Sequence, residues 1–247
     1  MTDENSNGTL RRNEFLAERV RQQLEGFPEK FRELGEGGEL RKLCREPTTL
    51  SGPKVNQAPE DFTEQYLIEP VLHGLGYWNP SSDRYSGTGP HFVRRPSTYR
   101  HVEIKRPDYL LKNVSPRLVC FLEAKAANEE QATGDKRRAT ADIEEYVESD
   151  TFAKYLETLE KRYLVAIGTD SFRWVLWAKD VRTGETRPEL ATVDFSDAIE
   201  SIAKRDRVIE GEPDHSTTDV RKLIADEFVP AFAARSVTEF VTGAFAD

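Results

Sequence analysis

The stretch at residues 106–126, "RPDYLLKNVSPRLVCFLEAKA", constrains the fold more than any other part of the chain. It has the pattern of two apolar strands, "DYLL" and "LVCFLEAKA", joined by a turn. Three charges interrupt this pattern, because Asp108 opens the first strand while Glu123 and Lys125 lie in the second. An unpaired charge in a core is costly or titrates until it is neutral, so the three charges require a chemical explanation.

The charges in the second strand fall on one face, because successive side chains of a strand point to opposite sides. Glu123 and Lys125 share a face, and Asp108 is expected beside them across a short pairing. The opposite face stays apolar and is predicted to pack in the core, with Leu118, Cys120, Leu122, Ala124 and Ala126. The charges therefore mark one polar side of an otherwise buried strand.

Two carboxylates and one ammonium at a strand end have the chemistry of a metal site with a nearby positive charge. Mg²⁺ prefers oxygen ligands and often takes one or two carboxylates together with waters and substrate phosphates. We expect Asp108, Glu123 and the carbonyl of Ala124 to bind Mg²⁺, with Mn²⁺ as a substitute, and Lys125 to orient or deprotonate a water or to offset developing charge. Such a pair of charges on a strand is also the ordinary pattern of a surface ion pair, and the motif alone leaves that alternative open.

The rest of the chain predicts an α/β fold with a mixed sheet flanked by helices. Apolar periodicity indicates a helix at 9–25 and another at 61–74, followed by a polar loop over 79–98. Further predicted elements are strands at 100–111 and 117–126, a long amphipathic helix at 135–160, a hairpin formed by "RYLVAIGTD" and "SFRWVLWAKD", a strand at 187–194 and helices toward the end.

Composition excludes several classes of function. The 247 residues are 37% apolar, which permits a core, and the net charge of −9 argues against a general coat for nucleic acids but allows a local basic cleft. Two cysteines make neither a disulfide framework nor a zinc site, and the four histidines show no ligand spacing. No apolar run of membrane-spanning length occurs, so we expect no membrane partner and a cytoplasmic location.

Pro107-Asp108 followed by Glu123-x-Lys125 resembles the signature of the PD-(D/E)xK nuclease superfamily. The upstream helix "FTEQYLIEPVLHGLGYW" resembles the first core helix of that superfamily, in which an acidic residue often joins the metal site, and Glu64 matches that residue. With the downstream "YLVAIGTDSFRWVLW", the run 61–180 resembles the N-terminal nuclease domain of type I restriction motor subunits and fused type II restriction enzymes.

This resemblance implies a restriction-endonuclease-like domain over 56–208, with an N-terminal helical extension at 1–55 and a C-terminal helical segment at 209–247. It implies a Mg²⁺-dependent DNA endonuclease in restriction or phage defence, acting as a homodimer or with separate methyltransferase or motor subunits. The implied catalytic residues are Asp108, Glu123, Lys125 and Glu64.

The sequence departs from the family in the helix after Lys125. Those domains often carry Gln about a turn before an aromatic residue, whereas Asp142 and Glu144 precede Tyr146 here. An alternative is therefore a catalytically idle subunit that binds DNA or a partner protein. A nuclease acting on RNA or on branched DNA is a third alternative.

Two basic clusters flank the proposed site in sequence and are candidates for contacts to nucleic-acid phosphates. Charge runs are more often solvated faces, which is the competing interpretation. The first cluster contains Arg94, Arg95, Arg100, Lys105 and Arg106, and the second contains Lys136, Arg137 and Arg138.

Overall fold

The structure, a computed structural model, describes residues 3–82, 85, 87–96, 107–129, 138–149 and 160–246. The described residues form one mixed sheet of six strands in the order β1-β2-β3-β4-β5-β6. Every neighbouring pair is antiparallel except β3 and β4, which run parallel. The strands are β1 (His91–Arg94), β2 (Tyr109–Lys112), β3 (Leu118–Ala124), β4 (Tyr163–Thr169), β5 (Arg173–Asp180) and β6 (Thr186–Asp194).

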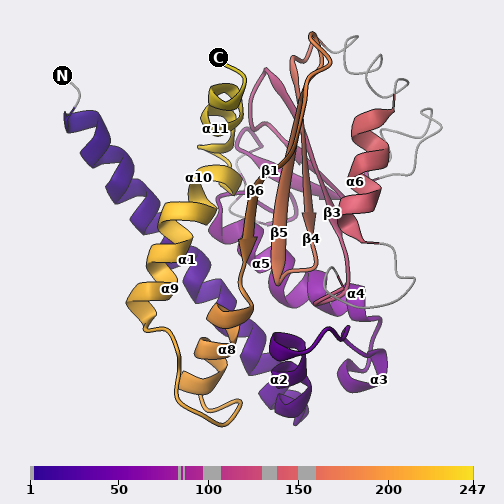
Figure 1. The fold of residues 1–247 in the computed structure, drawn as a ribbon, viewed down its shortest axis with the longest axis vertical. Helices are drawn as coiled ribbons and strands as arrows, with labels where there is room; N and C mark the ends of the chain where they lie inside the picture. Colours follow the sequence, from indigo (N-terminus) through magenta and orange to yellow (C-terminus); the bar gives the residue numbers. More distant parts are fainter. Residues whose placement is uncertain are drawn as a thin grey trace.

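Helices cover both faces of the sheet, which confirms the predicted α/β class (Figure 1). Helix α6 (Ala139–Glu148) lies on one face, and most of the other helices lie on the opposite face and below the sheet. These others are α1 (Asp3–Leu34), α2 (Gly37–Arg45), α3 (Gly52–Val55), α4 (Pro59–Thr63), η1 (Glu64–Ile68), α5 (Glu69–Gly74), α8 (Ser196–Arg205), α9 (Thr217–Leu223), η2 (Ile224–Phe228), α10 (Val229–Phe232) and α11 (Val237–Ala244).

The parallel pairing of β3 and β4 sets the position of the candidate site. Parallel neighbours need a crossover connection, and α6 lies between these two strands in the chain. The register places Glu123 opposite Gly168 and Ala124 opposite Thr169. The two strands therefore end at the same edge of the sheet, and Glu123 and Lys125 lie at that edge.

Two apolar cores lie on the two faces of the sheet. The main core packs one face against α1, α5, α8, η2 and α10, and it contains Cys120 and Leu122. The α6 core packs the other face against α6, and it contains Val119 and Phe121. The predicted packing face of β3 is confirmed, but the opposite face was wrongly predicted to be a polar side, because Val119 and Phe121 cover it with apolar surface under α6.

Helix α1 is longer than the predicted 9–25 and belongs to the main core. Its side chains Val20, Leu24, Phe27 and Phe31 are fully buried. It packs against α5, α8 and η2, and the Arg19 guanidinium donates to the His73 carbonyl at 2.8 Å. Helix α1 and the C-terminal helices therefore share the main core with the sheet.

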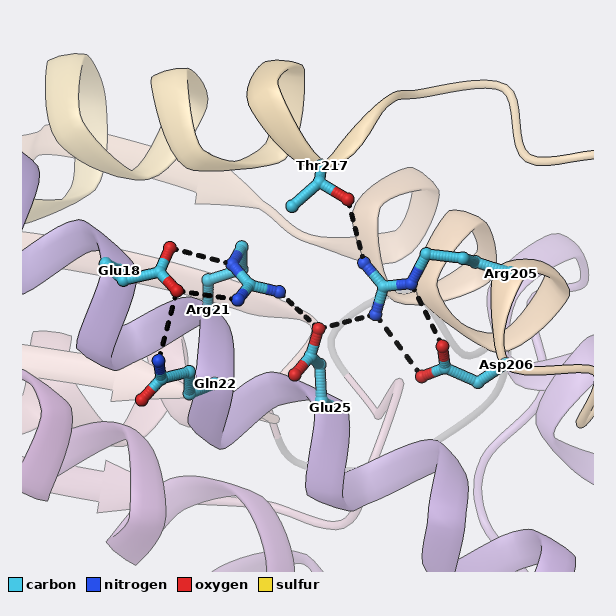
Figure 2. Close-up of polar contacts among 7 residues, drawn as sticks. All are labelled: Glu18, Arg21, Gln22, Glu25, Arg205, Asp206 and Thr217. Atoms are coloured by element: carbon cyan, nitrogen blue, oxygen red, sulfur yellow. Dashed lines mark hydrogen bonds and ion pairs between the residues drawn. The ribbon is translucent and has the colours of Figure 1, made fainter.

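A chain of ion pairs on the surface joins α1 to α8 (Figure 2). Both Arg21 and Arg205 bond to the carboxylate of Glu25, and Arg205 also bonds to Asp206 and to the Thr217 hydroxyl. Partly exposed pairs of this kind contribute about 1 kcal/mol or less each. They orient α1 against α8, while the buried apolar side chains supply most of the stability.

Two π-helical segments share one sequence feature, a proline two residues after the segment. Pro70 follows η1 and Pro230 follows η2. The last amide before each proline donates five residues back, from Glu69 to the Glu64 carbonyl and from Val229 to the Ile224 carbonyl. Proline lacks an N–H and its ring crowds the preceding turn, so a wider turn lets the helix continue.

Some predicted boundaries need correction. Strand β1 lies inside the predicted polar loop 79–98, because Phe92 packs against Tyr109 and His73 even though the strand has few apolar residues. The strand predicted at 100–111 begins at Tyr109 within the described residues, and 97–106 lie outside them. The described part of the predicted helix 135–160 is α6.

The predicted hairpin and the last strand are confirmed as β4, β5 and β6. Ser171 in the hairpin turn has a φ of 75°, and its amide donates to the Thr169 hydroxyl at 2.8 Å. Across the residues that the structure describes, no helix combines the length and the apolar character that crossing a bilayer requires.

Candidate active site

Asp108 and Glu123 lie side by side where β2 begins and β3 ends. Asp108 directly precedes β2, and the register that pairs Tyr109 with Leu122 places it next to Glu123. The Ala124 amide donates to Asp108 Oδ2 at 2.9 Å, and the Arg95 amide donates to the Asp108 carbonyl at 2.6 Å. These bonds hold Asp108 in place from both neighbouring strands.

The carboxyl group of Glu123 is almost fully buried, with 1% of the residue exposed. Burial and the neighbouring Asp108 carboxylate raise the pKa of Glu123 to about 9, although Tyr146 and Lys125 act to lower it. Glu123 therefore carries a proton at neutral pH, which lets it bond to Asp108. Its Oε1 atom is buried and has no hydrogen-bond partner in the described part of the chain.

Lys125 follows β3 and is held by α6. Its ammonium lies 2.7 Å from Asp142 Oδ2, and its amide donates to the Thr169 carbonyl at 2.9 Å. Burial by itself would lower the pKa of Lys125, but the bond to Asp142 outweighs burial and the pKa is raised. Lys125 is therefore a fixed positive charge at the end of the strand.

Helix α6 supplies two side chains to this group. Asp142 and Tyr146 are four residues apart, so both lie on the helix face that packs on β3. Burial and the Glu123 carboxyl raise the pKa of the Tyr146 hydroxyl, so it stays protonated beside Glu123. Glu144 is exposed, so Asp142, and not Glu144, is the acidic residue of the two that faces β3.

Glu64, which the sequence predicted to support the site, is held by Tyr109 and Arg94. Its buried carboxylate accepts from the Tyr109 hydroxyl and bonds Arg94 Nε at 2.8 Å. Burial raises the pKa of Glu64, while Tyr109 and Arg94 act to lower it. Tyr109 packs in the main core, and the Asp108 carboxylate also acts to raise the pKa of Glu64. Glu64 therefore lies within electrostatic range of Asp108 and remains a predicted site residue.

Glu60 lies one helical turn before Glu64 and was missed by the sequence analysis. Burial and the Asp108 carboxylate raise the pKa of Glu60, and Lys125 lowers it. Glu60 therefore lies within electrostatic range of both Asp108 and Lys125. The four-residue spacing from Glu64 was the available signal, because it places both carboxylates along one helix face.

The basic residues have mixed positions. Arg94 and Arg95 bond Asp61 at 2.8 and 3.3 Å, so both guanidiniums are engaged with acidic side chains of the α4–η1 helix. Arg138 is exposed at the start of α6. The other predicted phosphate contacts lie outside the described residues, namely Arg100, Lys105, Arg106, Lys136 and Arg137.

The Asp108–Glu123 pair has the properties of a cation site that needs further ligands. Within the ranges that the structure describes, no three His, Cys, Asp or Glu side chains converge closely enough to hold a metal ion by themselves. Two carboxylates are sufficient for Mg²⁺, which usually keeps several waters and binds substrate phosphates. Because Glu123 is protonated beside the Asp108 carboxylate, a divalent cation that binds both groups would replace this proton, and the buried Glu123 Oε1 has no hydrogen-bond partner in the described residues.

None of the family models, curated proteins or solved structures compared with the chain matches it. A function must therefore be argued from the chemistry of the site. The site brings together two facing carboxylates, a fixed ammonium and a buried phenol at one edge of a sheet.

Proposed function

We propose that the chain is a Mg²⁺-dependent endonuclease that hydrolyses phosphodiester bonds in DNA, in restriction or phage defence. The observation that carries the proposal is the Asp108–Glu123 pair beside Lys125. Burial and the adjacent Asp108 carboxylate raise the pKa of Glu123 to about 9, and such perturbed groups cluster at functional sites.

The order of elements supports a restriction-endonuclease-like arrangement for residues 56–208. The helix that carries Glu60 and Glu64 precedes the antiparallel strands β1, β2 and β3, and α6 then leads to β4, parallel to β3. The position of Asp108 before β2 and of Glu123 near the end of β3 supports the proposal, because it brings the two acidic residues of the predicted motif together.

Each residue has a distinct role in the proposed reaction. Asp108, Glu123 and the Ala124 carbonyl would hold Mg²⁺, for which Mn²⁺ would substitute. When bound, Mg²⁺ supplies charge to the scissile phosphate and lowers the pKa of a nearby water. Lys125 stays charged because its pKa is raised, so it donates to a phosphate oxygen or orients the water and does not serve as the base. Asp142 keeps that ammonium in position.

The proposal is tested by cleavage of a supercoiled plasmid with purified protein, Mg²⁺ and EDTA controls. Asp108→Ala and Lys125→Ala are each expected to lose about 100-fold or more in rate. Glu144→Ala is the matched control, because Glu144 is exposed on α6, and it is expected to cleave like the wild type. Equal cleavage by wild type and Asp108→Ala would overturn the site.

A catalytically idle subunit that binds DNA or a partner protein is the second candidate. One observation favours it, because the ammonium of Lys125 is already committed to Asp142 at 2.7 Å. Calorimetric titration with Mg²⁺ and Mn²⁺ separates the two candidates. No metal binding, together with DNA affinity that EDTA leaves unchanged, would support the idle subunit. Cutting both strands of a duplex would suit a homodimer, or a complex with methyltransferase or motor subunits.

A further inference from the structure

Three arginines line a pocket of about 320 Å³ at the end of the sheet opposite the candidate active site. Arg117 directly precedes β3, Arg162 directly precedes β4, and Arg182 lies in the turn after β5. Glu160 completes the lining. Because β3 has 7 residues, the pocket lies roughly 20 Å from Glu123 and Lys125 and is a separate site.

Backbone hydrogen bonds fix the three arginines next to one another. The amides of Arg162 and Tyr163 donate to the Arg117 carbonyl at 3.0 and 3.1 Å. The Val181 amide donates to the Arg162 carbonyl at 2.8 Å, which places Arg182 beside the other two. The cluster is therefore set by strand pairing and does not depend on a chance arrangement of long side chains.

Asp180 and Tyr163 hold the guanidinium of Arg162, the central arginine, in a fixed orientation. Arg162 Nε and Nη2 bond Asp180 Oδ2 at 3.1 and 3.0 Å, and the guanidinium lies 4.8 Å from the centre of the Tyr163 ring. Asp180 Oδ1 accepts from the Arg182 amide at 3.0 Å. The buried carboxylate of Asp180 thus holds two of the three residues that line the pocket.

The outer guanidiniums remain available to a ligand. Arg117 and Arg182 are exposed, and neither guanidinium has a hydrogen bond or ion pair with another residue in the described part of the chain. Glu160, also exposed, opposes them with one negative charge. Guanidinium groups present forked donors that match the oxygens of a phosphate group and can bind it in bidentate fashion.

We propose that this pocket binds a phosphate group, held by Arg117 and Arg182 against the oriented Arg162. The proposal does not depend on nuclease activity, because the pocket shares no residue with the candidate active site. Free phosphate and the backbone phosphates of a nucleic acid present the same chemistry to the pocket. The probes used in the test distinguish between these two sources.

The test uses the full chain in EDTA with three probes: inorganic phosphate, pyrophosphate, and a fluorescein-labelled single-stranded DNA of 12 nucleotides. Arg117→Ala/Arg182→Ala is expected to weaken binding at least tenfold, and Glu160→Gln to strengthen it severalfold, because that change removes the opposing charge. Arg41→Ala is the control, since Arg41 is exposed on α2, at the far end of the sheet in Figure 1, and it is expected to bind like the wild type.

The outcomes separate the sources and decide the proposal. Binding of the small anions identifies free phosphate as a ligand, and binding of the oligonucleotide alone identifies backbone phosphates, provided that the double variant loses it. The proposal is overturned if no probe binds the wild type, or if the double variant binds as tightly as Arg41→Ala. Circular dichroism of each variant checks folding. Glu160→Gln keeps all three arginines and is expected to change the affinity in the opposite direction to the double variant.

Discussion

The ammonium of Lys125 lies 2.7 Å from the carboxylate of Asp142, and both side chains are withdrawn from water, with 11% and 0% exposed. A charge in that position is tolerated only because its partner is there. The pair joins the end of β3 to α6, the helix that covers the same face of the sheet. It therefore affects both the stability of the fold and the position of the ammonium in the proposed site.

Removing Asp142 alone is expected to destabilise the protein strongly. Asp142→Ala leaves the Lys125 ammonium buried without its carboxylate, and breaking a buried pair in this way costs about 3–5 kcal/mol. The double variant Asp142→Ala/Lys125→Met removes both charges and is expected to recover part of that loss. Urea unfolding, followed by circular dichroism, measures the free energy of unfolding of each variant.

The control for this cycle is an exposed pair with similar geometry. Arg187 and Glu185 are 2.8 Å apart with 44% and 47% of their side chains exposed, so Glu185→Ala is expected to cost less than about 1 kcal/mol. A double variant that is less stable than Asp142→Ala alone would show that the ion pair does not account for the loss.

Glu123 predicts a pH dependence of stability with a definite sign. Its pKa is about 9 in the folded protein and near 4.5 when the chain is unfolded, so between these values the folded state binds one more proton. Stability therefore falls as pH rises through this window, by at most about 1.4 kcal/mol per pH unit from this group. Glu123→Gln cannot lose a proton, so its unfolding free energy is expected to decline less steeply between pH 5 and pH 9.

Mg²⁺ provides the matching test. At pH 8 a cation that binds the Asp108–Glu123 pair would stabilise the folded wild type, because a ligand that binds only the folded state shifts the equilibrium toward it. Glu123→Gln is expected to respond less to Mg²⁺. For the pH prediction, the same dependence of the unfolding free energy on pH in the wild type and in Glu123→Gln would contradict the assignment of the raised pKa to Glu123.

The strand pattern around residues 106–126 was sufficient to predict which side chains of β3 pack in the main core. Alternation along β3 correctly separated Cys120 and Leu122 from Glu123, because side-chain direction on a strand depends only on position in the sequence. It did not reveal that α6 buries the Glu123 face, since that contact depends on tertiary packing between Phe121 and Tyr146.

The parts that the sequence did not reveal depend on long-range contacts. Strand β1 is short and is recognisable only by its pairing with β2, and Glu60 is linked to the site only by its approach to Asp108 and Lys125. Glu64 was predicted from a family resemblance, and the bond of the Tyr109 hydroxyl, 45 positions away, to its carboxylate was not predicted. No local pattern encodes these contacts.

Gly74 is expected to tolerate no side chain, because α1 and α5 approach each other there. A Cβ atom at this position would lie 2.9 Å from Val20 Cα and 3.1 Å from Val20 N, so the backbone of α1 would have to move. Gly74→Ala is therefore expected to destabilise the protein by about 1–3 kcal/mol in urea unfolding.

Gly26, within α1 itself, is the matched control. It is exposed, and a Cβ atom there would meet nothing within 4 Å. Gly26→Ala is expected to stabilise the protein by about 0.5–1 kcal/mol, because alanine loses less conformational freedom in a helix. If Gly74→Ala were as stable as the wild type, the packing of α1 against α5 would be looser than the structure indicates.

The last prediction separates Glu60 from Glu64. Glu60 is half-buried within range of Asp108 and Lys125, so its charge would act on a cation held by the Asp108–Glu123 pair. Glu60→Gln is expected to weaken Mg²⁺ binding about tenfold in a calorimetric titration, as loss of an outer-shell partner does. Glu64→Gln is expected to change the affinity less but to lower stability by about 1–3 kcal/mol, because Tyr109 and Arg94 would lose a buried charged partner. A larger loss of Mg²⁺ affinity in Glu64→Gln than in Glu60→Gln would reverse this assignment and make Glu64 the residue that acts more strongly on the cation.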